Sequence, residues 1–486
     1  MGAGLPGPSR LTPPVSCGYI TIVETQLPRR DKSRILAICC FSLFIVGLDV
    51  TVVNVALPTI GRELHSGLSG LQWTIDAYTV VLASLLMLGG SLGDRLGRKR
   101  VFITGLSVFS LASLLCSLAP TTGLLIAFRA LQAVGGSMLN PVAMGIVTNT
   151  FTQPRERAQA VGLWGSVFGV SLALGPVVGG ALVSAIGWRP IFWINVPVGL
   201  AAILLTIRFI PDSRAPRPRR FDPVGQLLVM VLLGALTYGI IEAPGSGWTS
   251  PEILAAFAAS GAALLGLLLY EPRRKEPLID LRFFRSIPFT SAVVIAVAAF
   301  AAFGGFLFLN TLYLQEARGL SPVQAGLLTV PVALMIMVAS PLSGRIVGRR
   351  GPRLPLVLAG VGLLIACILL AGIGPATPLV GLLAIYVVFG LGFGLVNAPI
   401  TNTAVSGMPR EQAGVAAAIA TTSRQVGQVL GVAVVGALAG THAGTSAHAS
   451  WWTLAGCGAV ILLLGFFATT RRATESAERT AAMAIG

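Results

Sequence analysis

The sequence has few charged residues for its length. Only 11% of its 486 residues are Asp, Glu, Lys or Arg, whereas 54% are hydrophobic. A soluble domain of this size would need a far more polar surface to meet water. Lipid is therefore the expected solvent for most of the chain.

Cysteine pairs, histidine clusters and nucleotide-binding motifs are also missing. The six cysteines are scattered, none forms a CxxC pair, and no histidine lies at ligand spacing from them. We expect no metal site and no cofactor. There is no GxxxxGK[ST] motif and no polar stretch long enough for a nucleotide-hydrolysing domain. Any energy that its function needs must then come from an ion gradient.

Long apolar runs occupy most of the chain. Each is about 20 residues long, which is the length an α-helix needs to cross a bilayer, whereas barrel strands would be about half as long. The expected fold class is an all-α polytopic membrane protein with 14 transmembrane helices. They are predicted at 35–57, 72–92, 101–119, 122–145, 160–183, 190–210, 223–243, 252–270, 288–313, 324–344, 354–373, 377–399, 413–437 and 451–469.

Positive charge lies on one side of this topology. The net charge is +16, and 29 of the 34 Lys and Arg lie in the two tails, in alternate loops or, for Arg208, at the end of a span that adjoins one of these loops. The opposite loops hold Arg62, Arg189 and Arg318. Because cytoplasmic loops are enriched in Lys and Arg, both termini are predicted to be cytoplasmic, with the protein in the plasma membrane. The basic charge therefore needs no nucleic-acid partner.

Internal repetition divides the chain into two halves. The stretch GSLGDRLGRKR at 90–100 matches GRIVGRRGPR at 344–353, an offset of 254 residues, and QPRERA at 153–158 matches MPREQA at 408–413. Repeated halves with a site between them are typical of secondary transporters. The predicted parts are a cytoplasmic tail (1–34), a six-helix bundle (35–210), a linker with two inserted helices (211–287), a second six-helix bundle (288–470) and a cytoplasmic tail (471–486).

The stretch 90–100 places one carboxylate among cations in a tight, glycine-rich turn. Such a group can form a salt-bridge latch that holds one conformation and opens in another, although any cytoplasmic loop is basic. The residues expected in this gating loop are Gly90, Asp94, Arg95, Gly97, Arg98 and Lys99.

The gating loop resembles the signature loop of the major facilitator superfamily, with G-x-L-x-D-R-x-G-R-K matched here. DVTVVNVALP at 49–58 and WRPIFWINVP at 188–197 are similar to signatures of its fourteen-helix drug:proton antiporter branch. The resemblance covers residues from about 35 to 470. It implies the major facilitator fold, with two six-helix halves and two inserted helices.

The predicted fifth helix contains a further motif of that superfamily. Gly175, Pro176, Gly179 and Gly180 resemble its antiporter motif, although Ser171 stands where another glycine is usual. Proline removes a backbone hydrogen bond and glycine allows close helix approach, so a kinked and tightly packed helix is expected. Ordinary packing of small residues is the alternative.

Four charged residues lie more than three residues from either end of a predicted span. A charge at the bilayer centre costs about 2.5 to 3.5 kcal/mol on insertion scales. Asp49 and Arg129 lie at similar depth and can pair. A buried carboxyl group holds a proton more readily and a neighbouring arginine opposes this, so we hypothesise that Asp49 carries a proton that Arg129 tunes. A purely structural ion pair is the alternative.

The other two charges, Asp76 and Arg424, are candidates for the substrate cavity. The resemblance makes Asp76 a substrate or proton site and Arg129 part of the helix-four arginine motif, with Ala133 in place of a glycine. Asp76 could instead be solvated, and Arg424 could bond backbone carbonyls rather than an anionic cargo. The remaining cavity candidates are Asn54, Asn310 and Asn397, for which bonding between helices is the alternative.

The predicted function is proton-coupled efflux of drugs or other small, mostly lipophilic molecules by alternating access. The expected partners are a small-molecule substrate, protons and the lipid bilayer, and the expected state is a monomer. The alternative is a proton-coupled transporter of one metabolite, antibiotic or amino acid, in either direction. A membrane enzyme or receptor is more distant, since the sequence lacks a catalytic cluster at an interface and a soluble output module.

Overall fold

The structure is a computed structural model that describes residues 28–215, 221–274, 276–406, 408, 413–439, 447–470, 472–473, 475–477 and 479. All regular structure in these residues is helical. The first six predicted spans correspond to α1 (Arg29–Glu63), α2 (Leu68–Leu96), α3 (Arg98–Ser117), α4 (Thr122–Thr150), α5 (Pro154–Ile186) and the broken pair α6 (Pro190–Trp193) and α7 (Asn195–Phe209).

The remaining helices follow the same order as the predicted spans. The inserted pair is α8 (Pro223–Ser246) and α9 (Pro251–Tyr270), followed by the short 3₁₀ turns η1 (Glu271–Arg273) and η2 (Leu281–Arg285). The last six spans are α10 (Ile287–Leu312) with its π-helical end η3 (Tyr313–Ala317), α11 (Pro322–Arg350), α12 (Arg353–Ala371), α13 (Leu379–Gly394) with α14 (Asn397–Val405), α15 (Ala413–Ala439) and α16 (Ala447–Phe467).

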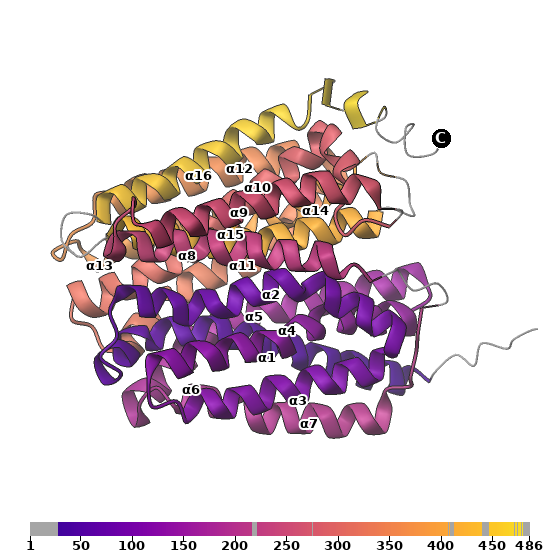
Figure 1. Cartoon of the computed structure of the whole chain (residues 1–486), viewed down its shortest axis with the longest axis horizontal. Helices are drawn as coiled ribbons and strands as arrows, with labels where there is room; N and C mark the ends of the chain where they lie inside the picture. Colours follow the sequence, from indigo (N-terminus) through magenta and orange to yellow (C-terminus); the bar gives the residue numbers. More distant parts are fainter. Residues whose placement is uncertain are drawn as a thin grey trace, which may run out of the picture.

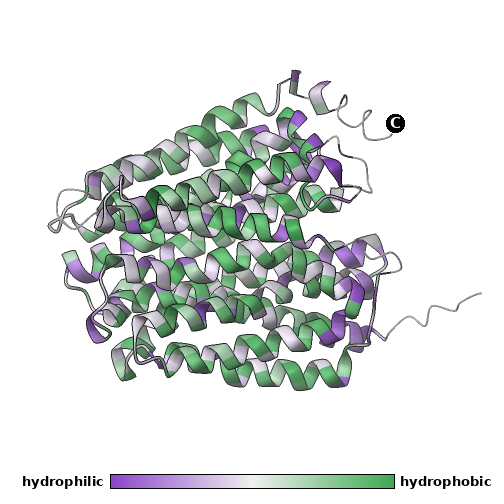
Figure 2. Cartoon of the chain, viewed as in Figure 1, coloured by the Kyte–Doolittle hydropathy of each residue, from purple (hydrophilic) through white to green (hydrophobic). Residues whose placement is uncertain are grey.

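Thirteen helical segments in the described residues are long and apolar enough to cross a membrane. The one predicted span that is not among them is the thirteenth, 413–437, which corresponds to α15; this helix is long enough but contains Arg424 and Gln428. This helix packs against α10, α2 and α8, so its polar side chains need not face lipid. Figure 2 shows polar residues gathered at the two ends of the helices and apolar residues between them. The chain is a multi-pass all-α membrane protein, as predicted.

The helices form two blocks with the inserted pair at their boundary. In Figure 1 the first six spans lie below and the last six above. The blocks meet where α5 contacts α11 and where α2 contacts α15, and α8 packs against both α2 and α15. We call the end that holds the α1–α2, α5–α6 and η3–α11 connections the outer end, following the predicted topology, and the opposite end the cytoplasmic end.

Local sequence signals explain where many of these helices begin. Proline is the first residue of α5, α6, α8, α9 and α11, and its fixed φ and missing N–H suit that position. At the start of α11, the Ser321 hydroxyl accepts from the backbone N–H of Gln324, while the Gln324 side chain accepts from the Ser321 N–H. This capping box satisfies two donors that would otherwise lie unpaired at the helix end.

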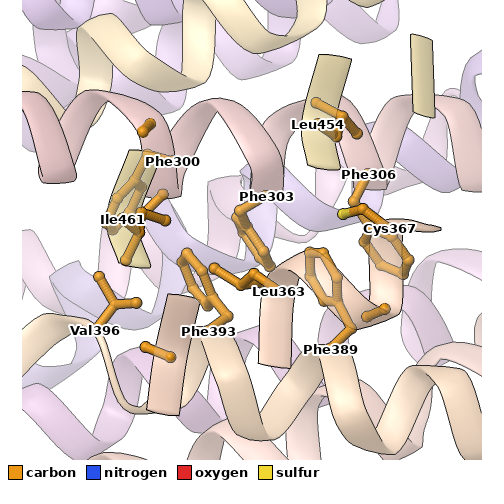
Figure 3. Close-up of a cluster of buried hydrophobic side chains, with 14 of the residues drawn as sticks. Phe300, Phe303, Phe306, Leu363, Cys367, Phe389, Phe393, Val396, Leu454 and Ile461 are labelled. Carbon is orange, nitrogen blue, oxygen red and sulfur yellow. The ribbon is translucent and has the colours of Figure 1, made fainter. Parts of the chain in front are cut away.

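A stack of aromatic rings holds the second block together. Phe303 of α10 stacks on Phe393 of α13 with ring centroids 4.3 Å apart, and Phe306 stacks on Phe389 at 4.1 Å (Figure 3). Such pairs contribute about 0.5 to 1.5 kcal/mol each beyond area burial. Their spacing of three or four residues places each set of rings on one face of its helix.

The two repeated stretches turn in the same way. The α2–α3 connection turns at Gly97 with φ 106°, and the α11–α12 connection turns at Gly351 with φ 78°. These glycines are 254 residues apart, which is the offset of the sequence repeat. Residues other than glycine rarely adopt positive φ, so the matched stretches share a backbone requirement as well as charge.

Replacing Gly97 by alanine is therefore expected to destabilise the protein by about 1 to 2 kcal/mol, because an L side chain is strained at this φ. A Cβ there would also lie 2.6 Å from a carboxylate oxygen of Asp212. Thermal unfolding in detergent should show a lower Tm than for the parent. The control is Gly234→Ala, in the middle of α8, where a Cβ would meet nothing within 4 Å. Equal Tm values for the two variants would contradict this explanation.

Candidate functional site

An ion pair lies inside the first block. Asp49 of α1 and Arg129 of α4 are 2% and 1% exposed, and Arg129 Nη1 donates to Asp49 Oδ2 over 2.5 Å. The structure thus brings together the two residues that were expected to pair. Breaking such a pair would leave an uncompensated buried charge.

Two amides complete the surroundings of Asp49. Gln132 Nε2 donates to Asp49 Oδ1 over 2.8 Å, and Asn195 Nδ2 donates to the same oxygen over 2.9 Å. Both oxygens of Asp49 therefore act only as acceptors, as in an ionised carboxylate. The Ser113 hydroxyl accepts from both amides, at 2.7 Å from Gln132 and 3.3 Å from Asn195.

Arg129 has several partners besides Asp49. Its Nη1 also donates to Gln132 Oε1 over 2.6 Å, and its Nε donates to the backbone carbonyl of Thr74 on α2 over 3.2 Å. The guanidinium carbon lies 4.3 Å from the ring centroid of Tyr78, within the range of a cation–π interaction. The network thus connects α1, α2, α3, α4 and α7, so a change at Asp49 affects the packing of five helices.

Sequence reasoning missed the amide and hydroxyl members of this network. Gln132 lies three residues after Arg129, on the same face of α4, which is a signal that helical spacing could have provided. Asn195 is the first residue of α7, where the sixth span breaks after Trp193. Ser113 has no such signal, because one serine in an apolar helix is unremarkable.

Asp76 lies in a different environment on α2. It is 0% exposed, and neither carboxylate oxygen has a hydrogen-bond partner among the described residues. The alternative of a solvated side chain was wrong, because α2 begins at Leu68 and the C-terminal block covers this part of it. One turn earlier, Gln72 donates to the backbone carbonyls of Val432 and Ala433 on α15.

Arg424 of α15 forms no ion pair with Asp49 or Asp76. Its Nη2 donates to Thr401 Oγ1 over 2.6 Å and to the Asn397 carbonyl over 3.4 Å, while its Nε has no partner among the described residues. No acidic residue lies within ion-pair distance of it in the described part of the chain. The geometry fits contacts to backbone and hydroxyl oxygens and leaves one donor available.

The predicted cavity asparagines do not form one group. The Asn54 amide donates to the Val50 carbonyl of its own helix over 2.8 Å, and its Oδ1 has no partner among the described residues. Asn310 accepts from the Tyr386 hydroxyl inside the second block, and the Asn397 carbonyl accepts from Arg424. Bonding between helices therefore describes Asn310 better than lining a cavity does.

The predicted gating loop is largely helical, which corrects the expectation of a loop over 90–100. The helix α2 continues through Gly90, Asp94 and Arg95 to Leu96, and only Gly97 interrupts it before α3 begins at Arg98. The prediction of a loop was wrong because the glycines of α2 allow close packing against α4 rather than a turn. A Cβ at Gly93 would lie 2.8 Å from Val142 of α4.

The charged residues of this stretch contact neighbouring helix ends. Arg98 Nη2 donates to Asp94 Oδ1 over 2.8 Å, and Arg98 Nη1 donates to the Gly145 carbonyl of α4 over 3.1 Å. Lys99 Nζ donates to the Ile207 carbonyl over 2.8 Å, in the last turn of α7, where a cation interacts favourably with the helix dipole. These contacts join the α2–α3 connection to α4 and α7, and their role as a latch stays a prediction.

The Gly-Pro motif of α5 lies where the two blocks touch at the outer end. A Cβ at Gly175 would collide with the Thr51 hydroxyl of α1, and one at Gly179 would lie 3.1 Å from Val52. A Cβ at Gly180 would lie 2.5 Å from the Pro322 carbonyl oxygen, and one at Gly326 of α11 would collide with the Pro176 carbonyl. These glycines therefore let α5 pack closely against α1 in its own block and against α11 in the other block.

These features define a helical membrane transporter: two repeated blocks, a buried charge network in one of them, and a glycine-lined contact between them. The sequence model of the Major Facilitator Superfamily matches residues 39–432, and the chain belongs to this family. The chain is 37% identical to the multidrug resistance protein Stp of Mycobacterium tuberculosis, over 82% of this chain and 74% of that protein.

Other relatives are also named for resistance. The chain is 38% identical to the tetracenomycin C resistance and export protein of Streptomyces glaucescens, over 84% of this chain and 76% of that protein. It is 35% identical to the methylenomycin A resistance protein of Bacillus subtilis, over 89% of this chain and 91% of that protein. The solved structure of a peptide transporter POT superposes on this chain with a TM-score of 0.68, over 91% of this chain and 95% of that chain. The sequence identity is 16%, so this likeness supports the fold alone. The family resemblance drawn from the motifs is confirmed.

A double-mutant cycle tests the energetics of the ion pair. Asp49→Asn and Arg129→Gln alone are each expected to destabilise the protein by about 3 to 5 kcal/mol, because each leaves one buried charge unpaired. The double variant should lose less than the sum of the two losses, by about 0.5 to 3 kcal/mol. Unfolding of each variant at increasing concentrations of a denaturing detergent would measure these free energies of unfolding. Additive losses would contradict direct coupling. The exposed pair Asp31 and Arg34 on α1 is the control, with an expected coupling of about 0 to 1 kcal/mol.

The outer contact gives a second prediction. Gly180→Ala should hinder closure of α5 against α11, because the added methyl meets backbone rather than a flexible side chain. Spin labels at Ile186→Cys and Leu327→Cys, both exposed positions, should report a longer distance between the helices in a cysteine-free background. Gly169→Ala on the same helix, where a Cβ meets nothing within 4 Å, should leave the distance distribution unchanged. An unchanged distribution for Gly180→Ala would refute this role.

Proposed function

We propose that the protein exports small, mostly lipophilic molecules across the plasma membrane in exchange for protons, with both termini in the cytoplasm. The observation that carries the proposal is the buried ion pair of Asp49 and Arg129. The names of the relatives, which are resistance and export proteins, support outward transport of drugs. The charge asymmetry of the loops supports the orientation.

Protonation of Asp49 would change the contacts of Arg129. A neutral carboxyl group removes the charge that the guanidinium faces, whereas Gln132 Oε1, the Thr74 carbonyl and the Tyr78 ring remain as partners. The two protonation states therefore favour different positions of α4 relative to α1. Such a differential contact can bias an equilibrium between two conformations.

Alternating access requires the two blocks to move against each other. We propose that residues 35–210 and 288–470 move as the two bodies, with 211–287 between them. The contact of Gly180 with α11 would close the outer end, and the contacts of Arg98 and Lys99 would hold the cytoplasmic end of the first block. Transport by a monomer is sufficient for this scheme.

Asp76 is a second group on which a proton or a cationic cargo could act. An ionised carboxylate with no partner is costly in a buried position, so its charge needs a proton or a cation. Arg424, with its unused donor, would suit an anionic group of the cargo. With Asn54, these residues are the proposed substrate contacts, and Asn397 acts by holding Arg424.

Transport in proteoliposomes would test the coupling. Asp49→Asn should abolish accumulation of ethidium driven by an imposed pH gradient, because the proton has lost its site. Exchange of labelled for unlabelled ethidium, which needs no gradient, should persist and would show that the variant is folded and still binds cargo. Asp31→Asn, which changes an exposed carboxylate of the same helix, should behave as the parent. Gradient-driven accumulation by Asp49→Asn would overturn the proposal.

A transporter of one metabolite, antibiotic or amino acid remains the second candidate, because Asp76 and Arg424 together offer sites for both charges of a zwitterion. A panel of labelled cargoes in the same vesicles distinguishes the two. One accepted compound favours the specific transporter, and several unrelated compounds favour multidrug export.

A further inference from the structure

A cavity opens at the outer end, outside the network of Asp49. Its volume is about 740 Å³, within the range of sites that hold drug-sized ligands. It lies among the start of α2, the end of α8, the end of α10 with η3, the end of α15 and the start of α16. Neither Asp49, Asp76, Arg129 nor Arg424 lines it.

The wall of the cavity combines apolar, aromatic and acidic side chains. Leu71 and Leu309 supply apolar surface, and Tyr313 and Trp451 supply aromatic rings. Glu242, from the inserted helix α8, and Glu316, from η3, supply two carboxylates on different elements. Apolar and aromatic walls with a few placed charges are typical of small-molecule sites, and aromatic faces attract cations.

The two carboxylates are not neutralised by close ion pairs. Neither lies within ion-pair distance of a lysine or arginine in the described residues. Glu242 accepts instead from the indole N–H of Trp73 over 2.7 Å. Arg62 exerts an attraction on Glu316 from beyond that distance, and His448 also lines the cavity.

Two further arginines of the outer end differ in their contacts. Arg189 pairs with Glu63 over 3.1 Å, and the guanidinium of Arg318 lies 5.9 Å from the Tyr313 ring. Arg62, Arg189 and Arg318 are the arginines of the predicted outer loops. Arg318 Nη1 has no hydrogen-bond partner among the described residues, but neither Arg318 nor Arg62 lies within ion-pair distance of Glu242 or Glu316.

A local change of helix type shapes the wall. At η3 the hydrogen bonding of α10 shifts to the π pattern, in which the Arg318 N–H donates to the Tyr313 carbonyl over 3.0 Å. The Tyr313 hydroxyl donates to the Gly374 carbonyl over 2.8 Å, which fixes the ring against the α12–α13 connection. Such π-helical segments are costly and are frequent at functional sites.

We propose that this outer cavity binds an organic monocation with an apolar body, and that the inserted helix α8 completes the site by supplying Glu242. The cation is held between the two carboxylates, with its apolar body against Trp451, Tyr313 and the leucines. Identifying the cation as exported cargo rests on the proposed function, whereas binding itself does not. The ammonium headgroup of a phospholipid has the same chemistry and is the other possible source.

Equilibrium binding of tetraphenylphosphonium to the purified full-length protein tests the proposal. Glu242→Gln and Glu316→Gln should each weaken binding by about tenfold, and the double variant by more, since charged contacts in a partly buried site are the strong ones. Glutamine at 242 can still accept from Trp73, so the wall is preserved. The matched control is Glu252→Gln at the start of α9, which does not line the cavity and should bind as the parent.

The place where the cation binds and the origin of the cation are tested in separate experiments. Ala317→Cys, on the cavity wall, should react with a membrane-impermeant thiol reagent, and tetraphenylphosphonium should protect it in the parent background but not in the double glutamine variant. In nanodiscs, competition by phosphatidylethanolamine would identify a lipid headgroup as a natural occupant, and its absence would assign the site to cargo. Both results support the cavity as a cation site.

Three results would overturn the proposal: unchanged affinity in the glutamine variants, equal weakening in Glu252→Gln, or no protection of the cysteine at 317. None of these readouts needs a proton gradient. A failure of the export proposal, seen as transport that does not respond to pH, would therefore leave the binding result intact.

Discussion

The first block is built around the contact between Asp49 and Arg129, which are both buried. Two opposite charges buried in a low-dielectric interior are stable only when they are paired and their remaining hydrogen-bonding groups are satisfied. The structure meets this requirement with Gln132, Asn195 and the Thr74 carbonyl, each from a different helix. In the proposed scheme, a proton on Asp49 would remove one of the two charges and so alter contacts that join five helices.

The two blocks share a repeat but differ in what lies at their centres. The first contains the charged network, whereas the second is held by stacked phenylalanines of α10 and α13 (Figure 3). Apolar stacking does not depend on protonation, so the second block offers a rigid surface against which the first can move. Arg424 is the exception, and its hydroxyl and carbonyl partners make its charge independent of any acidic group in the described residues.

Sequence reasoning predicted the order and approximate limits of the spans, because bilayer thickness fixes the length of each apolar run. It also predicted that Asp49 and Arg129 could pair, because depth follows from position along a helix. It could not give the rotation of each helix, so Ser113 and Asn195 were missed and Asp76 was left between solvent and interior. Helical glycine was also misread: Gly90 and Gly93 indicated a loop but serve close packing of α2 on α4.

The inserted pair has a place in this scheme, because α8 packs on both α2 and α15 and so follows either block as the boundary changes. The account nevertheless depends on the charge state of one carboxyl group. Infrared difference spectroscopy of the protein with and without cargo would report that state directly through the C=O stretch of a protonated carboxyl group. We predict a difference band that disappears in Asp49→Asn and persists in Asp76→Asn. A band that is unaffected by Asp49→Asn would contradict the claim that Asp49 carries the proton.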